Sequence, residues 1–267
     1  MRSRLDLTGR PTLVVGGGGA GIGSAVAAAA AGAGAPVAVI THNADHAEAL
    51  LRLVRAAGVA VAAAVADVLD EGSLVAAIAR LQDELGPIRN LVNVVGGAAG
   101  EYHRPSAQPI DSFDRVMERN LRYVPVSCRE VGAALLAAGE TGSIVNISSG
   151  AARGAPLLGA YAAAKAGLEA LTRSMALAWG PHGIRVNAVS PGTTRTGDQE
   201  RGEVAPGIPL RRRGEASEVA AAVLFLLSDL SSYTTGHILP VDGGAALGHP
   251  GGEQLSAFAG RDRPAGR

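Results

Sequence analysis

The sequence predicts an α/β fold in a single domain, with a doubly wound, mostly parallel seven-stranded sheet and helices on both faces. Two observations support this prediction. Short apolar segments alternate with alanine- and leucine-rich segments of helical spacing along most of the chain, which is typical of βαβ units. A glycine cluster also follows the first apolar segment and opens the first helical one, as in sheets that bind nucleotides at the carboxyl ends of their strands.

The strands are expected where short runs rich in Val, Ile and Ala lie between Gly, Pro, Asn or Asp residues. Parallel strands joined by right-handed crossovers place helices on both faces of the sheet. The predicted strands are residues 12–16, 36–41, 59–66, 90–95, 143–147, 183–189 and 237–241.

The helices are expected where apolar residues recur at helical spacing, and several of these segments end at a glycine. Pro125 lies inside the longest one and should kink it or mark a local irregularity. The predicted helices are residues 22–33, 44–57, 70–85, 111–138, 158–179 and 215–227.

The composition excludes several classes of protein. The 24 basic and 24 acidic residues balance, which argues against a nucleic acid or an anionic membrane as the main partner. No apolar run reaches the roughly 20 residues of a membrane span. The single cysteine, Cys128, favours a reducing, cytoplasmic location. His42 and His46 have helical spacing but no third ligand nearby, so no metal site is expected.

The loop between the first strand and the first helix is a candidate dinucleotide site. Its glycines let backbone N–H groups approach a diphosphate, and the helix N-terminus adds a favourable dipole. By itself such a loop could also be only a flexible turn, but its position favours binding. The candidate contacts are Gly17, Gly21, Ile22 and Gly23.

Tyr161 and Lys165 are a candidate acid–base pair. Residues four apart lie on one face of a helix, and a nearby cation lowers the pKa of a phenol. In isolation the pair could equally be two surface residues. Several other motifs accompany it in order, namely Asn120 within 117–121, a serine pair at 148–149, and the segments 187–196 and 236–244.

Together these motifs resemble the short-chain dehydrogenase/reductase family, over about residues 7–244, and most closely its single-domain branch similar to 3-oxoacyl-carrier-protein reductases. The resemblance implies a Rossmann-type domain over 1–244 that binds a nicotinamide dinucleotide and transfers a hydride to or from a carbonyl carbon. Residues 245–267 are rich in Gly, Pro and charge and are expected to form a poorly ordered extension.

The resemblance also assigns roles. Tyr161 would exchange a proton with the substrate oxygen, and Lys165 would lower the tyrosine pKa and bind the nicotinamide ribose. Ser149 would orient the carbonyl, and Asn120 would hold a water that links Lys165 to solvent. Strand register selects Ser149, whereas the family spacing to Tyr161 selects Ser148. The remaining implied cofactor contacts are Asp67, Val68, Asn93, Gly96, Pro191, Gly192, Thr194 and Thr196.

The end of the second strand bears on the choice between NADP and NAD. An acid there would accept hydrogen bonds from the ribose 2′-hydroxyl and repel a 2′-phosphate. The family places that acid at Thr41, so it is missing, and Thr41, His42 and Asn43 tolerate a phosphate better. The sequence therefore favours NADP, with NAD as the alternative, and His42 could instead be a solvated loop residue.

The chain departs from the family pattern at three places. Gly16 stands where threonine is usual, which predicts a looser loop, and the turn after the fourth strand reads Asn93-Val94-Val95-Gly96. The segment 197–208 is short for a substrate lid and suggests an open pocket for a bulky or carrier-bound substrate.

The expected function is hydride transfer between NADPH and a ketone, and the family resemblance implies a homotetramer. The alternatives are an NAD-dependent secondary-alcohol dehydrogenase, a non-catalytic dinucleotide-binding regulator and an extended-branch epimerase or dehydratase. A regulator would be free to lose Tyr161 or Lys165, and an epimerase would need a larger C-terminal domain.

Overall fold

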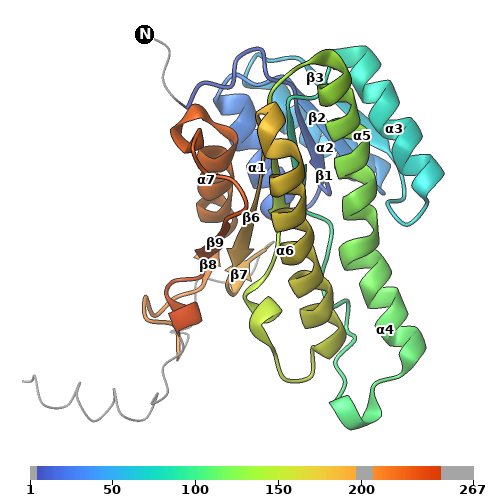
Figure 1. Ribbon diagram of the computed structural model, residues 1–267, viewed down its shortest axis with the longest axis vertical. Coiled ribbons are helices and arrows are strands. Elements are labelled where there is room, and N and C mark those ends of the chain that lie inside the picture. Colours follow the sequence, from blue (N-terminus) through green and yellow to red (C-terminus); the bar gives the residue numbers. More distant parts are fainter. Residues whose placement is uncertain (1–4, 197–206, 248–267) are drawn as a thin grey trace, which may run out of the picture.

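A computed structural model of the chain describes residues 5–196 and 207–247. Its main sheet has seven strands in the order β3-β2-β1-β4-β5-β6-β9, and every neighbouring pair is parallel. The predicted doubly wound sheet is therefore confirmed (Figure 1). The strands are β1 (Thr12–Val15), β2 (Val37–Thr41), β3 (Val61–Val65), β4 (Asn90–Asn93), β5 (Gly142–Ile147), β6 (Ile184–Pro191) and β9 (Ile238–Val241).

The helices cover the two faces of the sheet, and each face has its own apolar core. Side chains alternate between these cores along a strand, so that Leu13 and Val15 face one side while Val14 faces the other. On one face lie α3 (Glu71–Leu85), α5 (Tyr123–Ala138) and α6 (Gly159–Trp179), and on the other lie α1 (Ile22–Gly32), α2 (Ala44–Arg55) and α7 (Ala216–Leu227).

The helix predicted over 111–138 is not continuous. It consists of α4 (Ile110–Met117), a π-helical segment (Glu118–Arg122) and α5. Pro125 has no N–H, so the carbonyls of the preceding turn have fewer helical donors than they would have in an unbroken helix. The wider π turn accommodates this loss, and the irregularity expected from Pro125 is confirmed.

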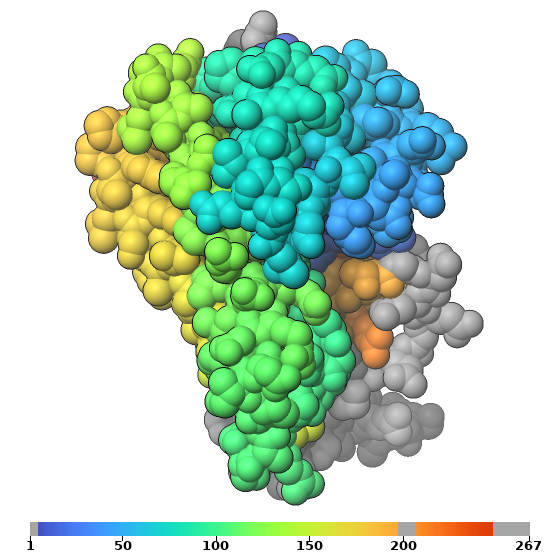
Figure 2. Space-filling view, turned by 90° about the vertical axis from the view of Figure 1, so that its right-hand side faces the viewer, coloured from blue at the N-terminus to red at the C-terminus, as the bar shows by residue number. Residues whose placement is uncertain are grey.

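The carboxyl ends of all seven strands lie at one edge of the sheet, and α4 extends beyond the body of the molecule on that side. Figure 2 shows α4 in green below the cyan α3. A second, two-stranded sheet, β7 (Thr194–Arg195) with β8 (Gly214–Glu215), lies beyond the end of β6 and was not predicted. This edge therefore has walls on both sides of the strand ends.

No helix among the described residues is both long and apolar enough to cross a membrane.

Candidate active site

A cavity of about 710 Å³ opens where β1 and β4 end side by side. This is the topological switch point of the sheet, because the chain winds outward from β1 and β4 in opposite directions. The glycine loop after β1 forms its floor, and the residues after β2, β3 and β4 form its walls. All four predicted loop contacts line it, namely Gly17, Gly21, Ile22 and Gly23.

The loop is built to approach a diphosphate closely. Helix α1 begins at Ile22 with no side-chain cap at Gly21 and no acidic residue in its first turn, so its first N–H groups remain available to an anion. A Cβ on Gly23 would collide with the carbonyl oxygen of Gly16. Gly23 therefore lets the first turn of α1 pack directly on the loop backbone, and a dinucleotide diphosphate fits the cradle of N–H groups at this helix N-terminus.

Two of the sequence departures contact one another. Gly16 has φ +102°, and a Cβ there would lie 2.6 Å from Val95 Cγ2 and 2.7 Å from the Val95 nitrogen. Val95 thus fills the space that a side chain at position 16 would need. The changed turn after β4 and the missing threonine at position 16 therefore meet at the same packing contact.

The end of β2 carries no acid toward the cavity. Thr41 is buried, with its Oγ1 accepting a hydrogen bond from the Asn43 N–H at 3.4 Å. Asn43 caps α2, because its Oδ1 accepts from the His46 N–H at 3.1 Å, and it does not line the cavity, unlike Thr41 and His42. His46, considered from the sequence only as a metal ligand, and Arg119, which the sequence did not single out, also line it. Asp67 is the only acidic side chain among the described lining residues.

The wall of the cavity after β3 is where the family resemblance places the adenine. Asp67 and Val68 both line it, as expected, and Asp67 Oδ1 accepts a hydrogen bond from the Leu69 N–H at 2.9 Å. Asn93 differs from the expectation. Its side chain is fully buried in the core, where its Nδ2 donates to Asn146 Oδ1 at 2.9 Å, and it does not line the cavity. Asn93 therefore holds β4 to β5 rather than contacting a ligand with its side chain.

Ser149, Tyr161 and Lys165 meet at the carboxyl end of β5. Lys165 is buried, its Nζ donates to the Ile147 carbonyl at 2.8 Å, and Nζ lies 5.8 Å from the centre of the Tyr161 ring. The Ser149 side chain lies close enough to the Tyr161 phenol to lower its pKa. Ser148 points elsewhere, donating to Glu169 Oε1 at 2.8 Å. Of the two candidate serines, only Ser149 acts on the pKa of Tyr161.

The titration of the pair differs from the expectation. Burial raises the pKa of Tyr161 above its ordinary value of 10, and the hydrogen bond from Ser149 offsets only part of this shift. The net shift of the Tyr161 pKa in the structure is thus upward, opposite to the lowering that the family resemblance implies. Burial also lowers the pKa of Lys165 to about 8. At neutral pH the phenol keeps its proton while most of the amine is still charged.

Lys165 is also the only lysine in the sequence, since every other basic side chain is an arginine. A guanidinium cannot lose its proton inside a protein, whereas a buried amine shifts its pKa readily. The use of lysine at this position alone indicates that position 165 requires an amine and not a guanidinium.

Asn120 lies in the π segment, and its side-chain amide is engaged. Its Oδ1 accepts from the Gly97 N–H at 2.8 Å, and its Nδ2 donates to the carbonyls of Gly97 at 3.1 Å and Val116 at 2.9 Å. A water linked to Lys165 would therefore have to be bound by an oxygen of Asn120. A Cβ on Gly96 would lie 2.7 Å from Asn120 Oδ1 and 3.0 Å from Lys165 Nζ, so these two side chains converge on Gly96.

The expected nicotinamide contacts lie after β6. Pro191 ends the strand, Gly192 donates its N–H to the Val241 carbonyl at 3.0 Å, and Thr194 Oγ1 donates to the Gly192 carbonyl at 3.2 Å. Thr196 Cγ2 lies 3.8 Å from the Cβ position of Gly21. This segment thus returns to the glycine loop. Most of the predicted lid, 197–206, lies outside the described residues.

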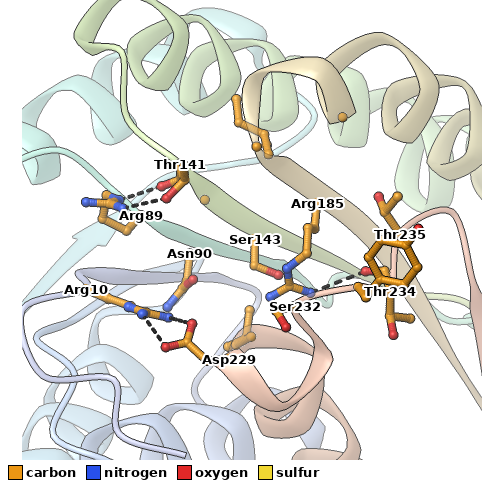
Figure 3. A pocket seen from close by; sticks show the side chains of 16 residues that line it. Arg10, Arg89, Asn90, Thr141, Ser143, Arg185, Asp229, Ser232, Thr234 and Thr235 are labelled. Carbon is orange, nitrogen blue, oxygen red and sulfur yellow. Dashed lines mark hydrogen bonds and ion pairs between the residues drawn. The ribbon is translucent and has the colours of Figure 1, made fainter. Parts of the chain in front are cut away.

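A second cavity, of about 600 Å³, lies at the amino ends of β4, β5 and β6 (Figure 3). Its arginines bind neighbouring protein groups. Arg10 bonds both oxygens of Asp229 at 2.7 and 2.8 Å, and Arg185 donates to Ser231 Oγ at 2.8 Å. We interpret it as a set of structural contacts remote from the catalytic side chains. No group of three or more His, Cys, Asp or Glu residues in the described part of the chain could hold a metal ion.

Comparisons with known proteins agree with this geometry. Residues 17–246 match a family profile described as "Enoyl-(Acyl carrier protein) reductase". A 2-(R)-hydroxypropyl-CoM dehydrogenase from Xanthobacter autotrophicus is 39% identical over 191 residues, which cover 67% of this chain and 75% of that protein. An L-xylulose reductase from Bos taurus is 39% identical over 170 residues, 60% of this chain and 68% of that protein.

Solved structures give the same result. The structure of a levodione reductase is 33% identical, with a TM-score of 0.84 and coverage of 91% of this chain and 99% of that one. An NAD+-bound xylitol dehydrogenase is 31% identical, with a TM-score of 0.82 and coverage of 89% and 99%. The chain therefore belongs to the short-chain dehydrogenase/reductase family of NAD(P)-dependent oxidoreductases that act on CH–OH groups.

Proposed function

We propose that the protein is an NADPH-dependent ketoreductase. The observation that carries the proposal is the geometry at the carboxyl end of β5, where the amine of the buried Lys165 lies 5.8 Å from the centre of the Tyr161 ring and Ser149 acts on the same phenol. A protonated phenol beside a serine hydroxyl is suited to donate a proton to a carbonyl oxygen.

The roles follow from the contacts. When bound, the dihydronicotinamide supplies the hydride that reduces the carbonyl carbon. Ser149 donates a hydrogen bond to the carbonyl oxygen and orients it beside Tyr161. Tyr161 gives its proton to that oxygen as the alcohol forms, and the Lys165 ammonium stabilises the resulting phenolate until solvent returns a proton.

The preference for NADPH is supported by the lining of the cavity. The position after β2 offers Thr41 and His42 instead of a carboxylate, and His46 and Arg119 add groups that can carry positive charge. A 2′-phosphate gains charge-assisted hydrogen bonds from such groups and meets no carboxylate at the end of β2. Asp67 lies after β3, where the family resemblance assigns it to adenine.

The proposal is tested by following ketone reduction with NADPH in the wild-type protein and in Tyr161→Phe. We expect the rate constant kcat to fall by about 10² to 10⁴, the usual contribution of a general acid, while NADPH binding stays within about twofold. Equal rates in the two proteins would contradict the role of Tyr161 and with it the proposed chemistry.

An NAD-dependent secondary-alcohol dehydrogenase is the second candidate. It is favoured by two solved relatives described with NAD bound, the xylitol dehydrogenase and a carveol dehydrogenase from Mycobacterium avium. Against it stands the uncharged end of β2. Faster oxidation of secondary alcohols with NAD+ than reduction of ketones with NADPH would select this candidate.

The substrate, assembly and location complete the proposal. We infer a small-molecule or carrier-bound ketone, a homotetramer formed through α5, α6 and the last strand, and a cytoplasmic location. Leu177 on α6 and Tyr233 before β9 are strongly exposed in the single chain, as expected of residues near contacts between copies. Sedimentation equilibrium should give four times the chain mass.

Cys128 is buried and burial raises its pKa to about 12, so it is an unreactive thiol.

A further inference from the structure

Arg153 lies four residues after Ser149, the serine of the proposed function. It ends the short 3₁₀ helix Gly150–Arg153, which begins directly after Ser149. Its Nη2 lies 3.8 Å from the point where a Cβ on Gly150 would be, and the same point lies 3.6 Å from the Pro191 carbonyl oxygen. The guanidinium is therefore next to the two segments that flank the reacting carbonyl in the proposed function.

The donors of Arg153 make no hydrogen bond with any described residue. Its nearest carboxylate is Asp242, with 3.7 Å between Nη2 and Oδ2, which is too long for a hydrogen bond. The Arg153 side chain is 51% exposed. An exposed pair at this distance contributes about 0–1 kcal/mol, so stabilisation of the fold does not account for this arginine.

Asp242 is held in place by other groups. Its Oδ1 accepts from the Gly244 N–H at 2.9 Å and its Oδ2 from the Ala246 N–H at 2.7 Å, and only 7% of its side chain is exposed. A Cβ on Gly192 would lie 2.8 Å from Asp242 Cα, so Asp242 also packs against the segment after β6. A fixed carboxylate near Nη2 orients the guanidinium and leaves its other N–H groups available.

We propose that Arg153 binds an anionic group of the substrate, so that the preferred ketones carry a carboxylate or a phosphate a few bonds from the carbonyl. A guanidinium offers parallel N–H donors that match the two oxygens of such groups. The inference rests on the proposed function for the position of the carbonyl, and it adds the class of substrate. Because the site is half open to solvent, the expected preference is about tenfold.

Matched probes test the site. Isothermal titration compares 4-oxopentanoate with its methyl ester, and dihydroxyacetone phosphate with dihydroxyacetone, each in the presence of NADP+. The first pair reports a carboxylate and the second a phosphate. We expect wild-type protein to bind at least one anion about tenfold more tightly than its neutral partner, Arg153→Leu to lose this preference, and Arg153→Lys to keep part of it.

The control is Arg173→Leu, which removes an exposed arginine three helical turns along α6 from Tyr161. It changes the net charge equally and should leave the preference intact. In steady-state reduction, Arg153→Leu should raise KM for the preferred anionic ketone about tenfold with kcat within about twofold, and leave the neutral ketone unchanged.

The outcomes separate the two proposals, because titration does not require turnover. Wild-type protein with no preference for either anion, or Arg153→Leu with an unchanged preference, overturns the anion site, even if ketones are reduced with NADPH. A preference that disappears in Arg153→Leu supports the anion site, even if no ketone is reduced, in which case the ketoreductase function fails instead.

Discussion

Lys165 shows how a single residue is placed at a cost to stability. Its amine is nearly fully buried, with one hydrogen bond to the Ile147 carbonyl at 2.8 Å, and burial lowers its pKa to about 8. A charged group in such a place destabilises the folded state. The proposed function would account for this cost, because in it the ammonium stabilises the phenolate of Tyr161 during reduction.

Replacing Lys165 with Met should stabilise the protein and abolish catalysis. The pKa falls from an ordinary 10.5 to about 8, and each unit corresponds to about 1.4 kcal/mol. After allowing about 1 kcal/mol for the lost hydrogen bond, Lys165→Met should gain about 2 kcal/mol at pH 7.

This gain has a definite pH dependence. Below pH 8 the lysine is charged in both the folded and unfolded states, so the destabilisation is complete. Between pH 8 and 10.5 the folded state releases its proton first, and the difference between the two proteins shrinks. Urea unfolding of both proteins at pH 7 and pH 10 measures it; a gain that grows with pH would contradict the burial of a charged amine.

Gly16 and Val95 form a second residue-scale prediction. Because a Cβ at position 16 would lie 2.6 Å from Val95 Cγ2 at a φ of +102°, Gly16→Thr should destabilise the protein by about 2–3 kcal/mol. Shortening Val95 to Ala should remove the contact with Cγ2 but leave the backbone nitrogen 2.7 Å away, so that it relieves part of the clash and makes the two substitutions non-additive by about 1 kcal/mol. Unfolding free energies of the two single variants and the double variant check this, and strict additivity would show that the residues do not compete for space.

At the scale of elements, the π segment between α4 and α5 joins the fold to the site. It presents Asn120 to the turn after β4, where the changed Val94 and Val95 stand. Tyr123 adds a bond there, its hydroxyl donating to the Val95 carbonyl at 2.9 Å. The segment thus holds the turn that a side chain at Gly96 would disrupt.

Asn120→Ala should therefore cost much more stability than loss of an ordinary cap. It removes three hydrogen bonds from a fully buried site, which should cost about 2–4 kcal/mol. Asn43→Ala, which removes the single cap bond of α2, is the matched control and should cost about 1 kcal/mol. If thermal unfolding showed the same loss of stability in Asn120→Ala and in Asn43→Ala, Asn120 would not hold the turn.

The elements also show what could be predicted from the sequence. Strand and helix positions were confirmed within a few residues, because apolar periodicity and glycine ends report local structure. The π turn could be located only as an irregularity near Pro125, since its register depends on the buried bonds of Asn120. The pairing of Gly16 with Val95 could not be foreseen, because about 80 residues separate them and only the parallel pairing of β1 with β4 brings them together.

At the scale of the whole molecule, the sheet gathers distant residues at one edge. The glycine loop follows β1, Thr41 ends β2 and Ser149 follows β5, while Tyr161 and Lys165 lie on α6, and all of them gather at the carboxyl edge of a parallel sheet. The motif order allowed Ser149, Tyr161 and Lys165 to be proposed from sequence. The raised pKa of Tyr161 required the fold, since burial decides it.

The most direct test of the proposed function is the pair of dissociation constants for NADPH and NADH, measured by fluorescence titration of the full chain and of Thr41→Asp. The structure leads us to expect NADPH to bind at least about tenfold more tightly to the wild-type protein, because phosphate gains charge-assisted hydrogen bonds where no carboxylate stands. The aspartate should reverse this order. Tighter binding of NADH by the wild-type protein would contradict the NADPH-dependent ketoreductase and favour an NAD-dependent alcohol dehydrogenase.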